Sequence, residues 1–369
     1  MEAFAGRYRL IDLIGTGGMG SIWRAWDLRR SAYVAAKVLG QHDAAALLRF
    51  VREQSLRIEH PHVVAPHGWA ADDDKVVFAM ELVRGGSVAT LLGDHGPLPT
   101  SYVAVLLDQL LHGLSAVHAA GVVHRDLKPA NLLLDATGKR RPHLRLSDFG
   151  VAGLLDEPRM TRHSTVLGTP GYIAPEQLAG ADPDPRQDLY TVGAVAAELL
   201  TGERPGPDGK LPPVDGPLAE FIRSSTATDP SQRPDSAHTA GRLLAESGAL
   251  PPAPTTPWAT QPDSPEVFDQ LPPLPRAWTP TGPAVQSHAA GQVATTAGTA
   301  AANPLATGDN APSHHGSTPI PSLSTPDSPA VVGGVAPAQS RSRLLVWVAA
   351  VSITGAVALL GTAAWLLLS

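Results

Sequence analysis

The sequence predicts an α+β fold in two parts, strand-rich at the N-terminal end and helical towards the C-terminal end, followed by a linker and one transmembrane helix. Three observations predict it. In the first eighty residues, short apolar runs are separated by glycine-rich or acidic turns, which is typical of short strands. Beyond residue 100, apolar residues recur at three- and four-residue spacing, which is typical of helices. After residue 247 the composition changes abruptly.

Residues 248–342 form a predicted disordered linker. This stretch of 95 residues holds 18 of the 36 prolines but only seven charged side chains, and Ala, Pro, Thr, Ser and Gly dominate it. Such a composition buries too little apolar area to offset the entropy of the chain. Its weak charge also argues against an arm that binds nucleic acid, so no nucleic-acid partner is expected.

Residues 344–368 are twenty-five consecutive uncharged residues, and about 20 apolar residues suffice to cross a bilayer. We predict a transmembrane helix; the alternative is a buried helix of a globular domain, which the all-round apolar character disfavours. Arg341 and Arg343 precede the segment, and basic residues favour the cytoplasmic side. The expected localisation is the cell membrane, as a single-pass protein with a cytoplasmic N-terminal part, no signal peptide and almost nothing outside.

The chain contains no cysteine. This excludes disulfides, thiolate catalysis and cysteine-based metal sites. The fourteen histidines form no cluster with the spacing of metal ligands, and the formal net charge of −6 concerns solubility rather than partners.

A glycine-rich run over residues 15–20 lies between predicted strands over 8–14 and 21–27. Its glycines allow the backbone to approach a ligand closely, and phosphates are the expected ligand. A dinucleotide-binding fold would need a helix to begin at these glycines. Because a strand follows instead, the pattern favours a hairpin that covers a nucleotide.

Lys37 is the only charged residue of a predicted strand over 34–39. The helix predicted over 44–59 carries Glu53 on its apolar face, where a carboxylate needs a partner. We therefore predict an ion pair between Lys37 and Glu53. A solvated edge lysine and an exposed helical glutamate are the alternatives.

The most specific pattern is the run His-Arg-Asp-Leu-Lys-Pro-Ala-Asn over 124–131, followed by an Asp-Phe-Gly triplet that begins at Asp148. It places an acid, a lysine and an amide at Asp126, Lys128 and Asn131, and then a second carboxylate. These groups are what the transfer of a phosphoryl group from a Mg²⁺-bound nucleotide to a hydroxyl requires.

The run resembles the catalytic loop of bacterial eukaryotic-like (Hanks-type) serine/threonine protein kinases. The resemblance covers about residues 8–245, and we predict a kinase domain over residues 8–247. It implies the two-lobed protein kinase fold, with a β-rich N-lobe and a helical C-lobe, and transfer of the ATP γ-phosphoryl group to Ser/Thr hydroxyls of proteins. Asp126 would be the catalytic base, and Lys128 would neutralise charge on the γ-phosphate. Asn131 and Asp148 would hold Mg²⁺ or Mn²⁺.

The resemblance also implies an ATP site between the lobes, with a hinge at residues 80–83 whose backbone would bind the adenine. The implied ATP-binding residues are Ile14, Gly15, Thr16, Gly17, Gly18, Met19, Gly20, Ser21, Ile22, Ala35, Lys37, Glu53, Glu81 and Val83.

Residues 168–176 resemble the segment of these kinases that docks a peptide substrate, with Thr169 near Asp126 and Lys128. Glu176 would pair with Arg233, and Asp188 would brace the catalytic loop. These last three roles are structural.

Arg125 directly precedes Asp126, a pattern associated with activation by phosphorylation, because a guanidinium binds a phosphate well. Thr161, Ser164 and Thr165 are the candidate sites, and we expect autophosphorylation of this loop. The stretch between Leu200 and Arg233 is short for the family, so a helix that often docks partners is expected to be shortened.

Two other classes of function compete with an active membrane-associated signalling kinase. A pseudokinase or scaffold would lack one of Lys37, Asp126, Asn131 and Asp148, and all four are present. A small-molecule kinase would lack the segment over 168–176. A homodimer is a further possible partnership, because small residues recur every four positions in the predicted membrane helix, at Ala350, Thr354, Ala358 and Thr362.

Overall fold

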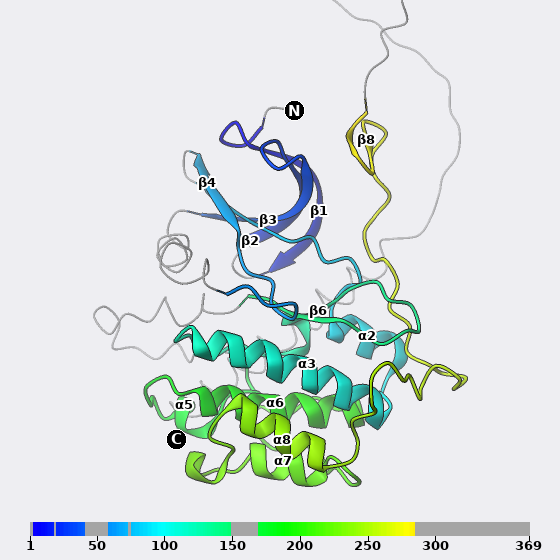
Figure 1. The fold of residues 1–369 in the computed structure, drawn as a ribbon. Helices are drawn as coiled ribbons and strands as arrows, with labels where there is room; N and C mark the ends of the chain where they lie inside the picture. The colour runs from blue at the N-terminus through cyan, green and yellow to red at the C-terminus, as the bar shows by residue number, and fades with distance from the viewer. Residues whose placement is uncertain (1–2, 18–19, 41–57, 73–74, 149–168, 285–369) are drawn as a thin grey trace, which may run out of the picture. The chain divides into compact units, whose positions relative to one another are not determined.

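The structure of the protein is a computed structural model. The residues that it describes are 3–17, 20–40, 58–72, 75–148 and 169–284. These residues fall within one compact unit, Met1–Ala290. A five-stranded antiparallel sheet makes up the upper lobe, and helices make up the lower lobe (Figure 1). The predicted α+β class, with a β-rich N-terminal lobe and a helical C-terminal lobe, is confirmed.

The sheet of the upper lobe has the strand order β1-β2-β3-β5-β4. Its strands are β1 (Tyr8–Gly17), β2 (Gly20–Asp27), β3 (Ala32–Gly40), β4 (Gly68–Asp72) and β5 (Lys75–Met80). Side chains alternate between its faces. On β3, Val34 and Ala36 pack into a small cluster with Tyr8, whereas Ala35 belongs to the large core that continues into the lower lobe.

The lower lobe is built around one long helix, α3 (Thr100–Ala119), in which twelve of the twenty residues are buried. It packs on α6 and α8. The other helices are α2 (Val88–His95), α5 (Pro175–Leu178), α6 (Pro185–Thr201), α7 (Ala219–Ser225) and α8 (Ala237–Glu246), with 3-10 turns at Pro129–Asn131 and Pro230–Gln232. Two short strands, β6 (Leu132–Leu134) and β7 (Leu144–Leu146), pair at the junction with the upper lobe.

The elements predicted from periodicity that fall on described residues agree with the structure. The strand expected after the glycine-rich run is β2, so the feature that argued against a dinucleotide-binding fold is confirmed. The helical periodicity noted beyond residue 100 begins with α3, whose first residue is Thr100. The helix predicted over 44–59 lies almost wholly outside the described residues. Between α6 and Arg233 the chain forms α7, which has only seven residues.

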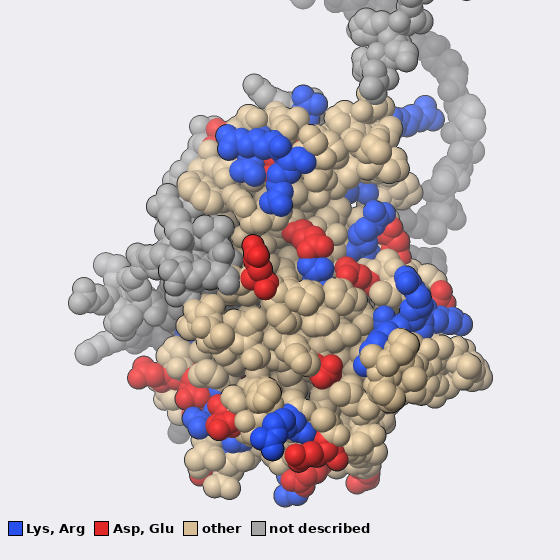
Figure 2. Space-filling view, viewed as in Figure 1, with Lys and Arg blue, Asp and Glu red and all other residues tan. Residues whose placement is uncertain are grey.

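Charge is distributed unevenly on the face that Figure 2 shows. Basic side chains gather over the strand-rich lobe, whereas acidic and basic side chains are interspersed over the helical lobe. Interspersed charges of both signs are typical of a soluble surface, and they agree with the small formal net charge of −6.

The chain that follows α8 differs from the predicted disordered linker. Residues 248–284, which we call the strap, pack against both lobes (Figure 1). Trp258 is fully buried and meets the ring of Tyr102 on α3 edge-on, with the ring centroids 4.9 Å apart. Val267 is 2% exposed and forms an isolated bridge with Gly138. An average composition over 95 residues concealed these few large apolar side chains.

The rest of the predicted linker, from residue 285, and the predicted membrane helix over 344–368 lie outside the described residues. Among the residues that are described, no helix combines the length and the apolar character that crossing a bilayer requires.

Replacing Trp258 with alanine tests whether the strap contributes to the fold. We expect Trp258→Ala to lower the free energy of unfolding by about 3–5 kcal/mol, because it leaves a cavity against Tyr102. Phe268→Ala is the matched control, since Phe268 also lies in the strap but is 55% exposed. Urea unfolding of both variants measures the difference, and equal stabilities would show that the strap is not part of the folded unit.

Candidate active site

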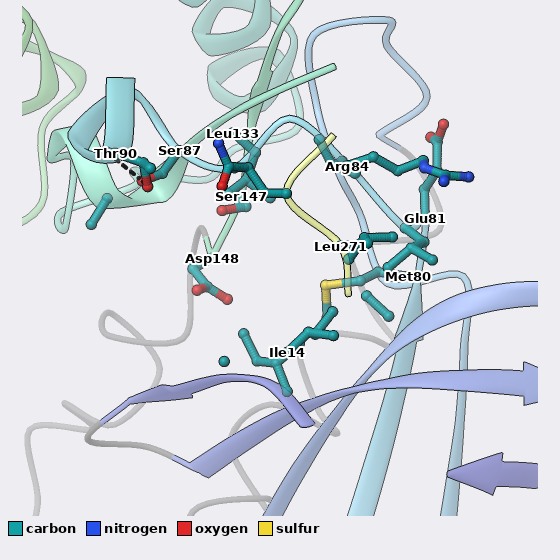
Figure 3. A pocket seen from close by; sticks show the side chains of 18 of the residues that line it. Ile14, Met80, Glu81, Arg84, Ser87, Thr90, Leu133, Ser147, Asp148 and Leu271 are labelled. Atoms are coloured by element: carbon teal, nitrogen blue, oxygen red, sulfur yellow. Dashed lines mark hydrogen bonds between the residues drawn. The ribbon is translucent and has the colours of Figure 1, made fainter. Parts of the chain in front are cut away.

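A cavity of about 510 Å³ lies between the two lobes (Figure 3). This volume is within the range of small-molecule sites, roughly 300–1,000 Å³. Residues of both lobes line it: Ile14, Gly15, Thr16, Ile22 and Ala35 from the sheet, Met80, Glu81, Leu82, Val83 and Arg84 from the connection between the lobes, and Ala130, Leu133, Ser147 and Asp148 from the lower lobe. Seven of the predicted ATP-binding residues are among them.

The β1–β2 hairpin forms the roof of the cavity, and its two strands pair as far as Gly17 and Gly20. Gly20 has φ +143°, and a Cβ there would lie 2.3 Å from the carbonyl oxygen of Val38. Only glycine fits this position, both for its backbone angle and for its distance from β3. The sequence requirement at this end of the hairpin is therefore steric.

The connection between the lobes begins at Met80, at the end of β5. Glu81 forms an ion pair with Arg145 of β7, which fixes the start of the hinge to the lower lobe. The side chain of Glu81 is thus used for a contact between the lobes.

Asp126 is held by three neighbours. Lys128 Nζ lies 2.8 Å from Asp126 Oδ2, and Thr169 donates a hydrogen bond of 3.2 Å to Asp126 Oδ1. Asn131 Nδ2 donates to both the carbonyl and the carboxylate of Asp126, at 2.7 and 3.1 Å. Lys128 Nζ also reaches Thr169 Oγ1 at 3.1 Å. The structure therefore brings together all four predicted residues around one carboxylate.

Asp188 supports this loop from α6 below it. Its two oxygens accept hydrogen bonds from the backbone amides of His124 and Arg125 at 2.8 and 2.9 Å, and from His118 Nε2 at 2.8 Å. Burial opposes the charge of this carboxylate, which is 1% exposed, but the bond from His118 and the charge of His118 hold the pKa of Asp188 below its usual value. Asp188 is thus a charged anchor for the loop.

His124 is a fully buried ring, and burial lowers its pKa. Its hydrogen bonds are those of a neutral imidazole, in which one nitrogen accepts and the other donates. The amide of Asp126 donates to Nδ1 at 3.3 Å, so the proton lies on Nε2, which donates to the carbonyl of Ser147 at 3.0 Å. His124 thus links the catalytic loop to the residue before Asp148.

Lys37 Nζ forms an ion pair of 2.6 Å with Asp148 Oδ1, and the lysine side chain is only 9% exposed. Its predicted partner, Glu53, lies outside the described residues. Asp148 has φ +59°, in the left-handed region that side chains rarely adopt. Asp148, which lines the cavity, directs its carboxylate at Lys37.

The oxygen donors that could hold Mg²⁺ are Asn131 and Asp148. Among the described residues, Asn131 uses its amide nitrogen for the hydrogen bonds to Asp126, so its carbonyl oxygen remains a candidate ligand. Magnesium prefers oxygen ligands and often takes only one or two carboxylates from a protein. The donor set therefore fits the ion. The described residues contain no cluster of three or more His, Cys, Asp or Glu side chains that could bind a metal by themselves.

Glu176 and Arg233 form a bidentate ion pair, with distances of 2.6 and 2.7 Å. The side chain of Arg233 is fully buried and also bonds to the carbonyls of Ala227 and Arg186. The pair connects the segment after Thr169 to the chain before α8, as predicted.

Several predicted site residues lie outside the described residues: Gly18, Met19, Glu53, Thr161, Ser164 and Thr165. Other lining residues were not predicted from the sequence, among them Leu133 and Ser147. Alternation in β6 was an available signal for Leu133, since Leu132 and Leu134 are buried on the opposite face. The strap residues Gln270, Leu271 and Pro272, which also line the cavity, had no such signal.

The two-lobed fold, the covering hairpin and the loop around Asp126 define a protein kinase. The protein kinase domain model matches residues 8–240, more than half of the chain, and the chain therefore belongs to this family. Its curated relatives carry the names of serine/threonine-protein kinases, and the matched region is a domain of this class.

Three relatives illustrate the similarity. Serine/threonine-protein kinase PkaA of Streptomyces coelicolor is 37% identical over 210 residues, which are 52% of this chain and 38% of PkaA. PkaB of the same organism is 40% identical over 196 residues, 50% of this chain and 46% of PkaB. PknA of Mycobacterium tuberculosis is 37% identical over 199 residues, 51% of this chain and 45% of PknA. The chain thus spans less than half the length of these relatives.

Asp188→Asn tests the anchor beneath the loop. Three donors face the two oxygens of Asp188, and an amide would replace one acceptor with a donor. We expect the free energy of unfolding to fall by about 2 kcal/mol and kcat to fall by about tenfold, while nucleotide affinity is unchanged because Asp188 does not line the cavity.

Asp184→Asn is the control for this variant. Asp184 is the N-cap of the same helix, and asparagine caps a helix as well as aspartate does. Steady-state kinetics and urea unfolding measure both variants. A wild-type kcat in Asp188→Asn would contradict the role of this carboxylate in positioning the loop.

Proposed function

We propose that the protein transfers the γ-phosphoryl group of ATP to Ser and Thr hydroxyls of proteins. The observation that carries this proposal is the contact of Asp126 with Lys128, Asn131 and Thr169, in a loop that also contributes Ala130 to the wall of the cavity. A carboxylate held at this place can accept the proton of a substrate hydroxyl as it attacks.

The residues of the chain divide the work. Lys128 forms an ion pair with Asp126, and its ammonium group can turn towards the phosphoryl group. There it would neutralise the negative charge that the phosphoryl group carries during transfer. Lys37, which pairs with the cavity-lining Asp148, can bind phosphate oxygens. Mg²⁺, or Mn²⁺, when held by Asn131 and Asp148, would neutralise charge on the phosphates and orient them. Positioning and electrostatics then account for most of the catalysis.

The other two classes of function have less support. A pseudokinase would lack one of the four polar groups, and Lys37, Asp126, Asn131 and Asp148 are present, with Asp126 already bonded to its neighbours. A small-molecule kinase has no need of a peptide-docking segment. Thr169 begins such a segment and bonds to both Asp126 and Lys128, which favours a protein substrate.

The activity is proposed to depend on autophosphorylation at Thr161, Ser164 or Thr165. Arg125 supports this, because it follows His124 in the anchored loop and its guanidinium can donate bidentate hydrogen bonds to a phosphate. A phosphate on one of these side chains would add negative charge and acceptor oxygens that such a guanidinium can bind.

The protein is further proposed to act in membrane-associated signalling, as a single-pass cell-membrane protein with its kinase domain in the cytoplasm. The uncharged run over 344–368 and the preceding Arg341 and Arg343 support this orientation. Small residues at four-residue spacing in the run support a homodimer through it.

Asp126→Asn in the full chain tests the catalytic role. With ATP and Mg²⁺, we expect wild-type protein to phosphorylate itself within residues 149–168 and to phosphorylate a generic protein. Asp126→Asn should reduce both by at least about a hundredfold, the contribution of a general base. Mass spectrometry and radiolabel transfer measure the two effects.

Asp94→Asn is the control, because Asp94 is an exposed residue of α2. Equal labelling by Asp126→Asn and wild type would contradict the proposed catalysis. An active wild-type preparation without phosphate in residues 149–168 would contradict only the autophosphorylation.

Deleting residues 344–368 tests the membrane anchor. The full chain is expected to resist extraction from membranes by high salt, whereas the deleted form should appear in the soluble fraction.

In the full chain, Thr354→Leu combined with Ala358→Leu should weaken crosslinking between copies, since larger side chains prevent close helix approach. A deleted form that stays in the membrane, or unchanged crosslinking, would contradict the respective proposal.

A further inference from the structure

The strap, residues 248–284, crosses from the helical lobe to the strand-rich lobe past the cavity (Figure 1). It begins where α8 ends, and the family match has already stopped at residue 240. The strap therefore lies outside the part of the chain that matches the kinase family.

The strap is fastened to the helical lobe by buried side chains and a backbone bridge. Trp258 packs edge-on against Tyr102 and is fully buried. Val267 exchanges two backbone hydrogen bonds with Gly138, of 2.9 and 3.1 Å. Gly85 lies against this point, since a Cβ there would come within 2.5 Å of Val267 Cγ1. The absence of a side chain at Gly85 thus allows the strap to lie directly against the chain beside the hinge.

The strap then runs along the hinge itself. The backbone amide of Gln270 donates a hydrogen bond of 2.7 Å to the backbone carbonyl of Arg84. Asp269 forms an ion pair of 2.5 Å with the side chain of the same arginine. The two charged side chains are 58% and 42% exposed, so the ion pair contributes little energy. The pair and the backbone bond fix the register of the strap against the hinge.

A second anchor holds the far end to the strand-rich lobe. The strap closes in a small hairpin of β8 (Trp278–Thr279) and β9 (Gly282–Pro283). The ring of Trp278 lies 6.2 Å from each of Trp26 and Tyr33, and Tyr33 donates its hydroxyl proton to the carbonyl of Thr279. The segment beside the hinge is thus held at both ends.

Between the two anchors, Gln270, Leu271 and Pro272 line the cavity. Figure 3 shows Leu271 on the yellow strap segment among the labelled side chains of the cavity, together with Met80 and Ile14. Leu271 is partly buried, whereas Phe268, three residues earlier in the strap, is 55% exposed. The strap therefore presents an apolar side chain to the site and leaves a comparable one in water.

We propose that the strap is the outer wall of the nucleotide site, with Leu271 and Pro272 packing against the bound nucleotide beside the hinge. This inference rests on the proposed ATP site. An apolar wall there removes more of an adenine nucleotide from water and narrows its route out of the cavity. Nucleotide affinity then depends on residues that lie outside the region matched by the kinase family.

The test measures ADP binding by calorimetry and the KM for ATP, using the full-length chain in detergent. Leu271→Ala is expected to raise the Kd of ADP and the KM for ATP about three- to tenfold, because it removes three carbons from a partly buried wall. The value of kcat should change less than about twofold, because Leu271 is proposed to contact the nucleotide and has no role in the proton transfer to Asp126. Leu271→Met, which conserves volume, should keep near wild-type affinity.

Phe268→Ala is the matched control, an apolar truncation in the same strap outside the cavity, and it is expected to leave the Kd unchanged. Thermal unfolding of each variant shows whether the fold is intact. Tight ADP binding by wild type with the same Kd in Leu271→Ala would overturn the strap's role alone. Wild-type protein that binds no ADP would overturn the nucleotide site and the strap's role together.

Discussion

The catalytic loop depends on one buried carboxylate, that of Asp188. Burial alone would favour its neutral form, yet three donors converge on its two oxygens and keep its pKa low. Two of the donors are consecutive amides, so both the position and the direction of the chain at Arg125 are determined. Arg125 has φ +65°, a strained conformation for a side-chain-bearing residue. The hydrogen bonds to Asp188 offset that strain immediately before Asp126, so the placement of the catalytic carboxylate follows from the anchor.

A second buried group extends this order to the nucleotide side of the cavity. The neutral ring of His124 accepts from the amide of Asp126 and donates to the carbonyl of Ser147, which precedes the left-handed Asp148. One ring therefore couples the loop that receives the substrate proton to the residue proposed to hold the metal. Asp126 follows a residue in the left-handed region, and Asp148 adopts that conformation itself. Asp126 is held by Lys128, Asn131 and Thr169, whereas Asp148 is held by its ion pair with Lys37.

Sequence reasoning succeeded where a function requires fixed spacing. The offsets from Asp126 to Lys128 and Asn131 predicted a cluster, and the structure has it. The spacing of apolar residues along the chain predicted which side chains are buried in the two lobes. Within the described residues, the partner of Lys37 is Asp148, which lies 111 positions further along the chain. A contact between residues so far apart in sequence is created by tertiary packing, which local sequence patterns do not reveal. The strap was missed for a different reason: averaged over the linker, a few buried side chains such as Trp258 do not alter the composition.

The strap shows that the physical boundary of the catalytic unit is set by burial rather than by the extent of a family match. The match stops at residue 240, within α8, but the ring of Tyr102 on the central helix is covered by Trp258 and is 0% exposed. A chain ending after α8 would expose that ring, together with the surface beneath Val267. Because the segment that covers these groups continues directly along the hinge, stabilising the helical lobe and walling the cavity are consequences of the same packing. A substitution that loosens one is therefore expected to affect the other.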